Sequence, residues 1–272
     1  MENTYVKVEK IYNKIIQAET QNQPLYVCGP LGLGKTAAVE YYYQNKKAKW
    51  LSGETGFLSD MPDIFQMEEE TIIIDDISWL KDKESQEYIN QILDYNQKHI
   101  VMIGRARLPE WLKTACIKNR VVIADYADLQ LDEEEAKELL EVNHVTASYE
   151  DVKKMNEDAQ GQALFIIMAA YHMQNGETYS EIIKEEATVD VYHYFNQNLY
   201  EKWSPDLRDL LSIVSYFDEF NAELAEMVSG NRHAGVLINE ALAVGDFLLK
   251  KENNSYSMFK KIATLFFLEK FH

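Results

Sequence analysis

One run of eight residues constrains the fold of this chain more than any other feature: Gly29-Pro30-Leu31-Gly32-Leu33-Gly34-Lys35-Thr36. Two glycines separated by four residues and followed by Lys and Thr fit the phosphate-binding loop pattern. Glycine lets backbone N–H groups turn toward phosphate oxygens. We expect Lys35 to place its ammonium on the β- and γ-phosphates of a nucleotide, and Thr36 to offer its hydroxyl to Mg²⁺.

The sequence around this loop decides between a phosphate site and an ordinary glycine turn. Pro24 to Cys28 is a short apolar run typical of a buried strand. Thr36 to Gln44 contains no helix breaker and predicts a helix whose positive end faces the anion. Strand, loop and helix are the order that the motif requires. Every loop residue, together with Ala37 in the first helical turn, is therefore a candidate nucleotide contact.

The first half of the chain alternates apolar runs with helical patterns, which predicts a doubly wound α/β domain. The run Thr71 to Asp75 is almost continuously β-branched, as expected of a parallel strand buried on both faces. Helices are expected over Lys83 to Asn96 and from Pro109 onward. The predicted strands cover residues 24–28, 48–52, 71–75, 99–103 and 120–123.

Two aspartates end the third predicted strand. Because ligands bind at the carboxyl edge of open α/β sheets, Asp75 is expected to hold Mg²⁺ together with Thr36. Asp76 is the candidate general base that orients or deprotonates the attacking water. The alternative for Asp76 is a side chain that only caps the following turn.

An arginine follows the fourth predicted strand. Arg105 would lie beside the γ-phosphate if that strand lies between the first and the third in the sheet. A guanidinium can bind such oxygens through two parallel hydrogen bonds, so Arg105 is the candidate γ-phosphate sensor. A salt bridge to the acidic surface is the alternative.

The pattern changes after about residue 127, where strand signals cease. The acidic start Asp132 to Glu135 and the later apolar periodicity predict helices up to about Tyr200. Helical segments from Pro205 to Val244, followed by a hairpin around Glu252 to Asn254, suggest a winged helix. We therefore predict a nucleotide-binding core at 1–127, a helical lid at 128–202 and a winged-helix-like domain at 203–272.

The composition excludes other classes of protein. The 272 residues carry 27 Lys and Arg against 45 Asp and Glu, and a net charge of −18 repels nucleic acid. No stretch reaches the roughly 18 apolar residues of a membrane span, and the N-terminus lacks the features of a signal peptide. Cys28 and Cys116 lie in candidate core elements. We predict a cytoplasmic protein with reduced, buried thiols, no membrane contact and no direct DNA binding.

These motifs resemble the signal-transduction ATPases with numerous domains, the STAND P-loop NTPases. The specific parts are the glycine loop, the strand ending at Asp76, and Arg105 followed by Leu108-Pro109. Within this family, the chain most resembles the nucleotide-binding module of the maltose-regulon activator and its large LuxR-type relatives. The weaker matches, which extend the resemblance over nearly the whole chain, are Leu129 to Ala136, Asp158 to Met173 and Tyr256 to Leu268.

The resemblance implies a P-loop ATPase core of five strands, an all-α lid and a winged helix that packs between domains. It also implies a switch. ADP holds the module closed, an inducer and ATP favour an open form that self-associates, and slow Mg²⁺-dependent hydrolysis resets it. Such regulators continue into sensor and DNA-binding domains, so we expect this chain to be a fragment of a longer transcription regulator.

The chain departs from the family pattern at three places. Gln162 stands where the family often has Trp. Ser257-Met258-Phe259 replaces a run whose histidine contacts the diphosphate, which leaves open whether ADP locks the closed form. The segment between the second and third strands is short.

Two other functions remain open. One is an AAA-type remodelling or DNA-loading ATPase, which would need an arginine such as Arg107 or Arg120 to act on a neighbouring subunit. The other is a scaffold that binds nucleotide without turnover. Tyr5 to Val8 is a candidate adenine contact, with plain core as the alternative. The sequence does not indicate the inducer, the regulated genes or the oligomeric state.

Overall fold

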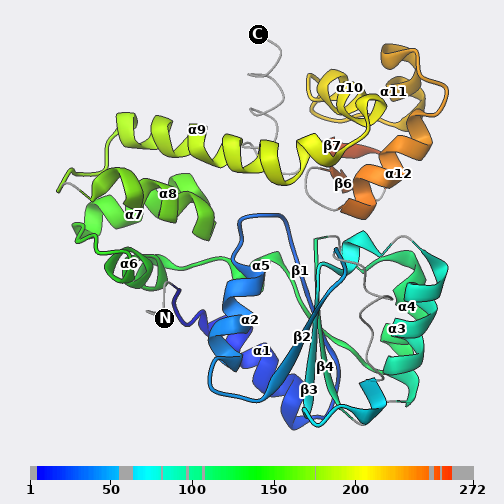
Figure 1. Cartoon of the computed structure of the whole chain (residues 1–272). Helices are drawn as coiled ribbons and strands as arrows, with labels where there is room; N and C mark the ends of the chain where they lie inside the picture. Colours follow the sequence, from blue (N-terminus) through cyan, green and yellow to red (C-terminus); the bar gives the residue numbers. More distant parts are fainter. Residues whose placement is uncertain are drawn as a thin grey trace. The chain divides into compact units, whose positions relative to one another are not determined.

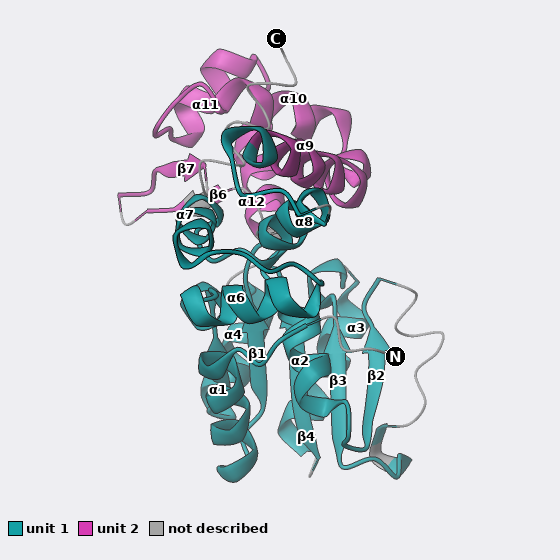
Figure 2. Ribbon diagram, turned by 90° about the vertical axis from the view of Figure 1, so that its left-hand side faces the viewer, with its two compact units in different colours: residues 1–184 teal, residues 185–272 magenta. Residues whose placement is uncertain are grey.

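The computed structural model describes residues 5–54, 64–80, 82–95, 98–105, 108–174, 176–244, 248–251 and 253–258. The chain divides into two compact units, Met1–Lys184 and Glu185–His272 (Figure 2). The predicted boundaries at residues 127 and 202 stay a prediction.

The first unit is built on a five-stranded parallel sheet with the order β2-β3-β4-β1-β5 (Figure 1). This confirms the predicted five-stranded parallel sheet. β4 lies between β1 and β3, which is the condition set above for Arg105. The strands are β1 (Leu25–Cys28), β2 (Ala48–Ser52), β3 (Thr71–Asp75), β4 (His99–Gly104) and β5 (Val122–Ala124).

β5 begins two residues later than predicted. Arg120 adopts a left-handed conformation with φ 51° and closes the turn after the preceding helix. The chain can enter the sheet only after this turn.

Helices cover both faces of the sheet (Figure 1). α1 (Glu9–Thr20) and α2 (Lys35–Tyr43) lie on one face, and α3 (Lys83–Tyr95) and α4 (Glu110–Lys118) on the other. Alternate strand residues such as Ile72 and Ile74 join a core with the apolar sides of α3 and α4. Cys28 and Cys116 are buried and lie outside any disulfide bond, as expected.

Four short or medium helices complete this unit: α5 (Tyr126–Leu129), α6 (Glu133–Val142), α7 (Tyr149–Ala159) and α8 (Ala163–Met173). Asp132 begins α6 with a capping box, because its carboxylate accepts from Glu135 N while the Glu135 side chain accepts from Asp132 N. The acidic run is thus a helix start. α9 (Glu181–Asn198) runs from the first unit into the second.

The second unit contains α10 (Pro205–Val214), α11 (Ala222–Ser229), α12 (Ala234–Val244) and the antiparallel strands β6 (Leu248–Lys250) and β7 (Tyr256–Met258). This order of helices and hairpin matches the expectation, although a winged helix remains a proposal. Most of the predicted match from Tyr256 to Leu268 lies outside the described residues.

One carboxylate ties the hairpin to the turn after α10. Glu219 accepts hydrogen bonds from the side chains of Lys251, Asn253 and Ser255. These three donors lower the pKa of Glu219 to about 2.

No helix among the described residues is long and apolar enough to cross a membrane.

Candidate functional site

The glycine loop connects β1 to α2 at the carboxyl edge of the sheet. Gly32 and Gly34 have φ of 83° and 80°, in the left-handed region that favours glycine. Gly34 is the N-cap of α2 and has no side chain to bond the first N–H groups of that helix. These N–H groups and the helix dipole therefore remain available to an anion.

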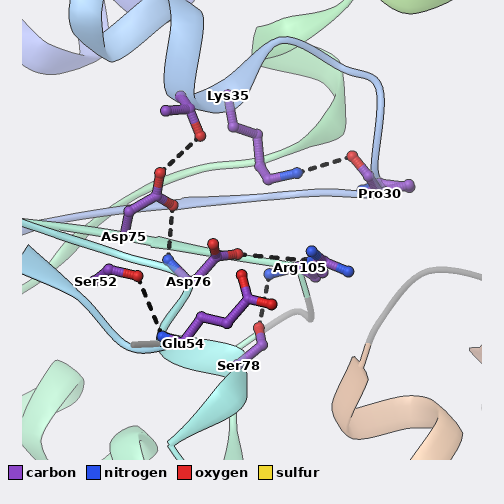
Figure 3. Close-up of polar contacts among 9 residues, drawn as sticks. Pro30, Lys35, Ser52, Glu54, Asp75, Asp76, Ser78 and Arg105 are labelled. Atoms are coloured by element: carbon purple, nitrogen blue, oxygen red, sulfur yellow. Dashed lines mark hydrogen bonds and ion pairs between the residues drawn. The ribbon is translucent and has the colours of Figure 1, made fainter. Parts of the chain in front are cut away.

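Lys35 follows the last glycine of the loop as the first residue of α2 and is only 8% exposed. Its ammonium donates to the carbonyl oxygen of Pro30 at 2.9 Å (Figure 3). The charge is thereby held over the loop, where it can bind phosphate oxygens.

Thr36 and Asp75 meet across the site. The Thr36 hydroxyl donates to Asp75 Oδ2 at 2.8 Å, although the two residues are 39 positions apart in the chain. Asp75 Oδ1 accepts from Asp76 N at 2.7 Å (Figure 3). A hydroxyl beside a carboxylate is a hard oxygen donor pair of the kind that Mg²⁺ takes up together with phosphates and water, so these residues fit the ion.

Mg²⁺ would neutralise phosphate charge at this edge of the sheet. The described residues contain no group of three or more His, Cys, Asp or Glu side chains that could hold a metal.

Asp76 adopts a left-handed conformation with φ 56°, and its side chain caps no backbone N–H of the following turn. Asp76 is thus the N-cap residue of the turn Ile77–Trp79, but its carboxylate makes no capping hydrogen bond. Burial and the neighbouring charge of Asp75 raise the pKa of Asp76, and Arg105 opposes this shift. A carboxyl with a raised pKa, close to the proposed cation ligands, is suited to accepting a proton.

Arg105 follows β4 and is 7% exposed. Its Nε lies 3.7 Å from Asp76 Oδ1, its backbone N–H donates to Ser78 Oγ at 2.8 Å, and its guanidinium carbon lies 5.2 Å from the centre of the Trp79 ring. The ion pair is thus made with a partly buried carboxylate of the site. Ser78 thus fixes the Arg105 backbone, and the Asp76 carboxylate faces the guanidinium (Figure 3).

Sequence reasoning missed Glu54, which follows β2. Its side chain points toward Asp76 and Arg105 (Figure 3), and its charge helps to raise the pKa of Asp76. Glu54 could have been found from the sequence, because it is an acidic residue just after β2, the strand that neighbours β3.

The start of α8 lies directly on the loop. Leu164 N donates to the carbonyl oxygen of Gly32 at 2.9 Å, and Gln162 Nε2 donates to that of Leu31 at 3.0 Å. Gln162 is 1% exposed. The sequence marked Gln162 only as a departure from a family pattern, whereas the structure places it against the phosphate loop.

The N-terminal segment also reaches the site. Tyr5, Val6 and Val8 are buried. Tyr5, Val6 and Lys7 line a solvent-open cavity of about 390 Å³ together with Tyr41, Glu138, Glu141 and Val142. The segment therefore packs into the core and also forms part of the cavity lining.

The two arginines considered for action on a neighbouring subunit lie elsewhere. Arg107 lies outside the described residues. Arg120 precedes β5 and is thus at the amino-terminal end of the parallel strands, opposite the loop.

No family model matches the chain. Among curated proteins, the serine/threonine-protein kinase PknK of Mycobacterium tuberculosis is 25% identical over 190 residues, which is 67% of this chain. The match spans only 17% of the length of that kinase.

Solved structures show the same fold at low identity. A Walker-type ATPase of Pyrococcus abyssi has a TM-score of 0.68 at 11% identity, covering 96% of this chain and 95% of that one. The RuvB Holliday junction branch migration motor of Thermotoga maritima has a TM-score of 0.51 at 16% identity, covering 93% and 91%. The chain therefore has a P-loop NTPase fold.

Proposed function

We propose that this chain is an ATP-binding, slowly ATP-hydrolysing switch module of a STAND-type regulator. Its cofactors would be ATP or ADP and Mg²⁺. The observation that carries the proposal is the bond between Thr36 and Asp75, because it joins the phosphate loop to the acidic strand at the edge where ligands bind.

Each residue of the site has one role in this proposal. The loop and Lys35 bind the phosphates, and Thr36 and Asp75 hold Mg²⁺. Asp76 accepts the proton of the attacking water. The Arg105 guanidinium moves from Asp76 to the γ-phosphate and binds it. The base is proposed to lie against the segment Tyr5 to Val8.

A switch is favoured by the contacts between α8 and the loop. Carbonyl oxygens of Leu31 and Gly32 are bonded to Gln162 and Leu164, so a change in the loop on binding phosphate acts directly on the start of a helix. Slow turnover coupled to rearrangement of helices is the behaviour that we propose. Protein-kinase activity is not part of the proposal, because Lys35 begins α2 directly after the glycine loop, whereas protein kinases carry the phosphate-binding lysine on a separate strand.

The remaining parts of the proposal concern partners. We propose self-association in the ATP state, an inducer that acts through domains outside this segment, LuxR-type regulation of transcription, and a cytoplasmic location. The second unit would be a winged helix that packs between domains. Its acidic helix start at Asn221 to Glu226 supports packing rather than DNA binding, since phosphates attract basic surfaces.

Substitution of Lys35 tests nucleotide binding. Lys35→Ala should abolish binding of ADP and ATP in calorimetric titration, whereas Lys49→Ala, at an exposed lysine on β2, should bind like the wild type. Full affinity in Lys35→Ala would refute the proposal.

Turnover assays and sizing separate the switch from its alternatives. A switch predicts slow hydrolysis and assembly only with ATP. Rings with cooperative, substrate-stimulated hydrolysis would indicate a remodelling motor. Tight nucleotide binding without any turnover would indicate a scaffold.

A further inference from the structure

The hydroxyl of Tyr5 lies against the last glycine of the phosphate loop. A methyl group built on the Cα of Gly34 would lie 2.0 Å from the Tyr5 hydroxyl oxygen and 2.7 Å from the ring carbon that carries it. Only a residue without a Cβ leaves room for this approach. Gly34 is followed by Lys35 and the first N–H groups of α2, so the phenol lies against the residue that directly precedes these phosphate donors.

This hydroxyl is a buried polar group whose hydrogen bonding is unsatisfied. Tyr5 is 6% exposed, and among the described residues its hydroxyl has no hydrogen-bond partner. Glu135, the charge that acts on Tyr5, already accepts from Glu9 N at 2.8 Å and from Asp132 N at 2.9 Å. Leaving a hydroxyl unpaired in the interior is unfavourable, so this group can accept a partner from outside the described residues, such as a ligand.

The protonation state of Tyr5 suits a donor. Burial, and secondarily the charge of Glu135, raise the pKa of the Tyr5 hydroxyl above its ordinary value. The group therefore keeps its proton at neutral pH and can donate it to an anionic oxygen, in a charge-assisted hydrogen bond.

Tyr5 also lines the solvent-open cavity described above. Its volume of about 390 Å³ falls in the range of roughly 300–1,000 Å³ that small-molecule sites have. Tyr5 is thus both a lining residue of this cavity and a neighbour of Gly34 in the phosphate loop.

We infer that the Tyr5 hydroxyl is a binding residue for nucleoside di- and triphosphates and donates a hydrogen bond to an oxygen of their phosphate chain. This inference rests on the proposed nucleotide site. It assigns a role to a side chain outside the loop motif. The contact should serve ADP and ATP alike, because the loop holds the phosphates that both have in common.

Tyr5→Phe tests the inference, since it removes only the hydroxyl. Calorimetric titration with ADP and with a non-hydrolysable ATP analogue should show affinities weaker by roughly tenfold or more for both ligands, as expected for a lost hydrogen bond to a charged group. Tyr95→Phe is the matched control, because Tyr95 is an exposed tyrosine at the end of α3, outside the site. Its affinities should equal those of the wild type. The Tm of Tyr5→Phe without nucleotide should not fall, because the hydroxyl bonds nothing in the described chain.

Each other outcome has a definite meaning. Unchanged affinity in Tyr5→Phe, with binding lost in Lys35→Ala, would overturn the inference and leave the proposed function intact. Tighter binding in Tyr5→Phe would also overturn it, since the hydroxyl would then obstruct the site. Absence of ADP and ATP binding by the wild-type chain would overturn both.

Discussion

Gly32→Ala should destabilise the first unit through the contact between the phosphate loop and α8. The new Cβ would lie 2.8 Å from Gln162 Nε2 and 2.9 Å from Leu164 Cβ, at a residue with φ +83°. A left-handed conformation costs alanine about 1–2 kcal/mol. Overpacking against Leu164, whose backbone is bonded to the loop, adds about 1–3 kcal/mol. The expected loss in the free energy of unfolding is therefore about 2–5 kcal/mol.

The chain provides a control that separates strain from packing. Gly176 has φ +81°, and nothing lies within 4 Å of a Cβ placed on it. Gly176→Ala should cost only the conformational strain of about 1–2 kcal/mol. Urea unfolding of both variants without nucleotide, monitored by circular dichroism, measures the difference in their free energies of unfolding. Equal losses in the two variants would refute the close packing of α8 on the loop.

A double-mutant cycle assigns part of this cost to one side chain. Gln162→Ala removes the nearest contact of the new methyl group. The combined variant should therefore lose roughly 0.5–1.5 kcal/mol less than the sum of the two single variants. Strict additivity would show that Gln162 does not contact residue 32.

Four further predictions address the site and the second unit. Thr36→Val, which removes the hydroxyl at similar volume, should bind ADP equally with Mg²⁺ and with EDTA, whereas the wild type should bind more tightly with Mg²⁺. Asp76→Asn should keep ATP affinity and slow single-turnover hydrolysis by at least about 100-fold, because general base catalysis contributes about 10²–10⁴-fold; an unchanged rate would exclude Asp76 as the base. Arg105→Lys should weaken ATP binding and leave ADP binding unchanged in the same titrations, since only ATP has the γ-phosphate. Glu219→Gln should lower the Tm at neutral pH, because the ionised Glu219 carboxylate stabilises the folded state. Since the folded-state pKa of Glu219 is depressed to about 2, this stabilisation is lost as the pH falls from about 4.5 to about 2, and the Tm difference from the wild type should close over that range. A Tm difference that persists at pH 2 would contradict this.

The core strands could be predicted because their signals are local. Continuous β-branched runs such as Thr71 to Ile74 are buried in a parallel sheet, and the acidic start at Asp132 forms a capping box. α1 was missed because Val8 provides no side-chain cap. Its buried residues Ile11, Ile15 and Ala18 nevertheless follow helical spacing, so the signal was present.

The site was predictable only where a residue type marks its own chemistry. Lys35 and Thr36 follow a glycine motif, and Asp75 ends a strand, so local order was enough to nominate them. Tyr5 and Gln162 belong to no motif. Their importance comes from contacts with loop residues far away in sequence, such as the bond from Gln162 to Leu31 across 131 positions.

The sequence by itself determined the strand–loop–helix unit and the acids at the carboxyl edge, because glycine conformations and strand burial act over a few residues. Only the tertiary structure decided that Arg105 pairs with Asp76, and that Tyr5 and Gln162 close on the loop. The physical reason is that such contacts depend on strand order and on how the helices pack. Burial across the whole unit sets both, and no local pattern records them.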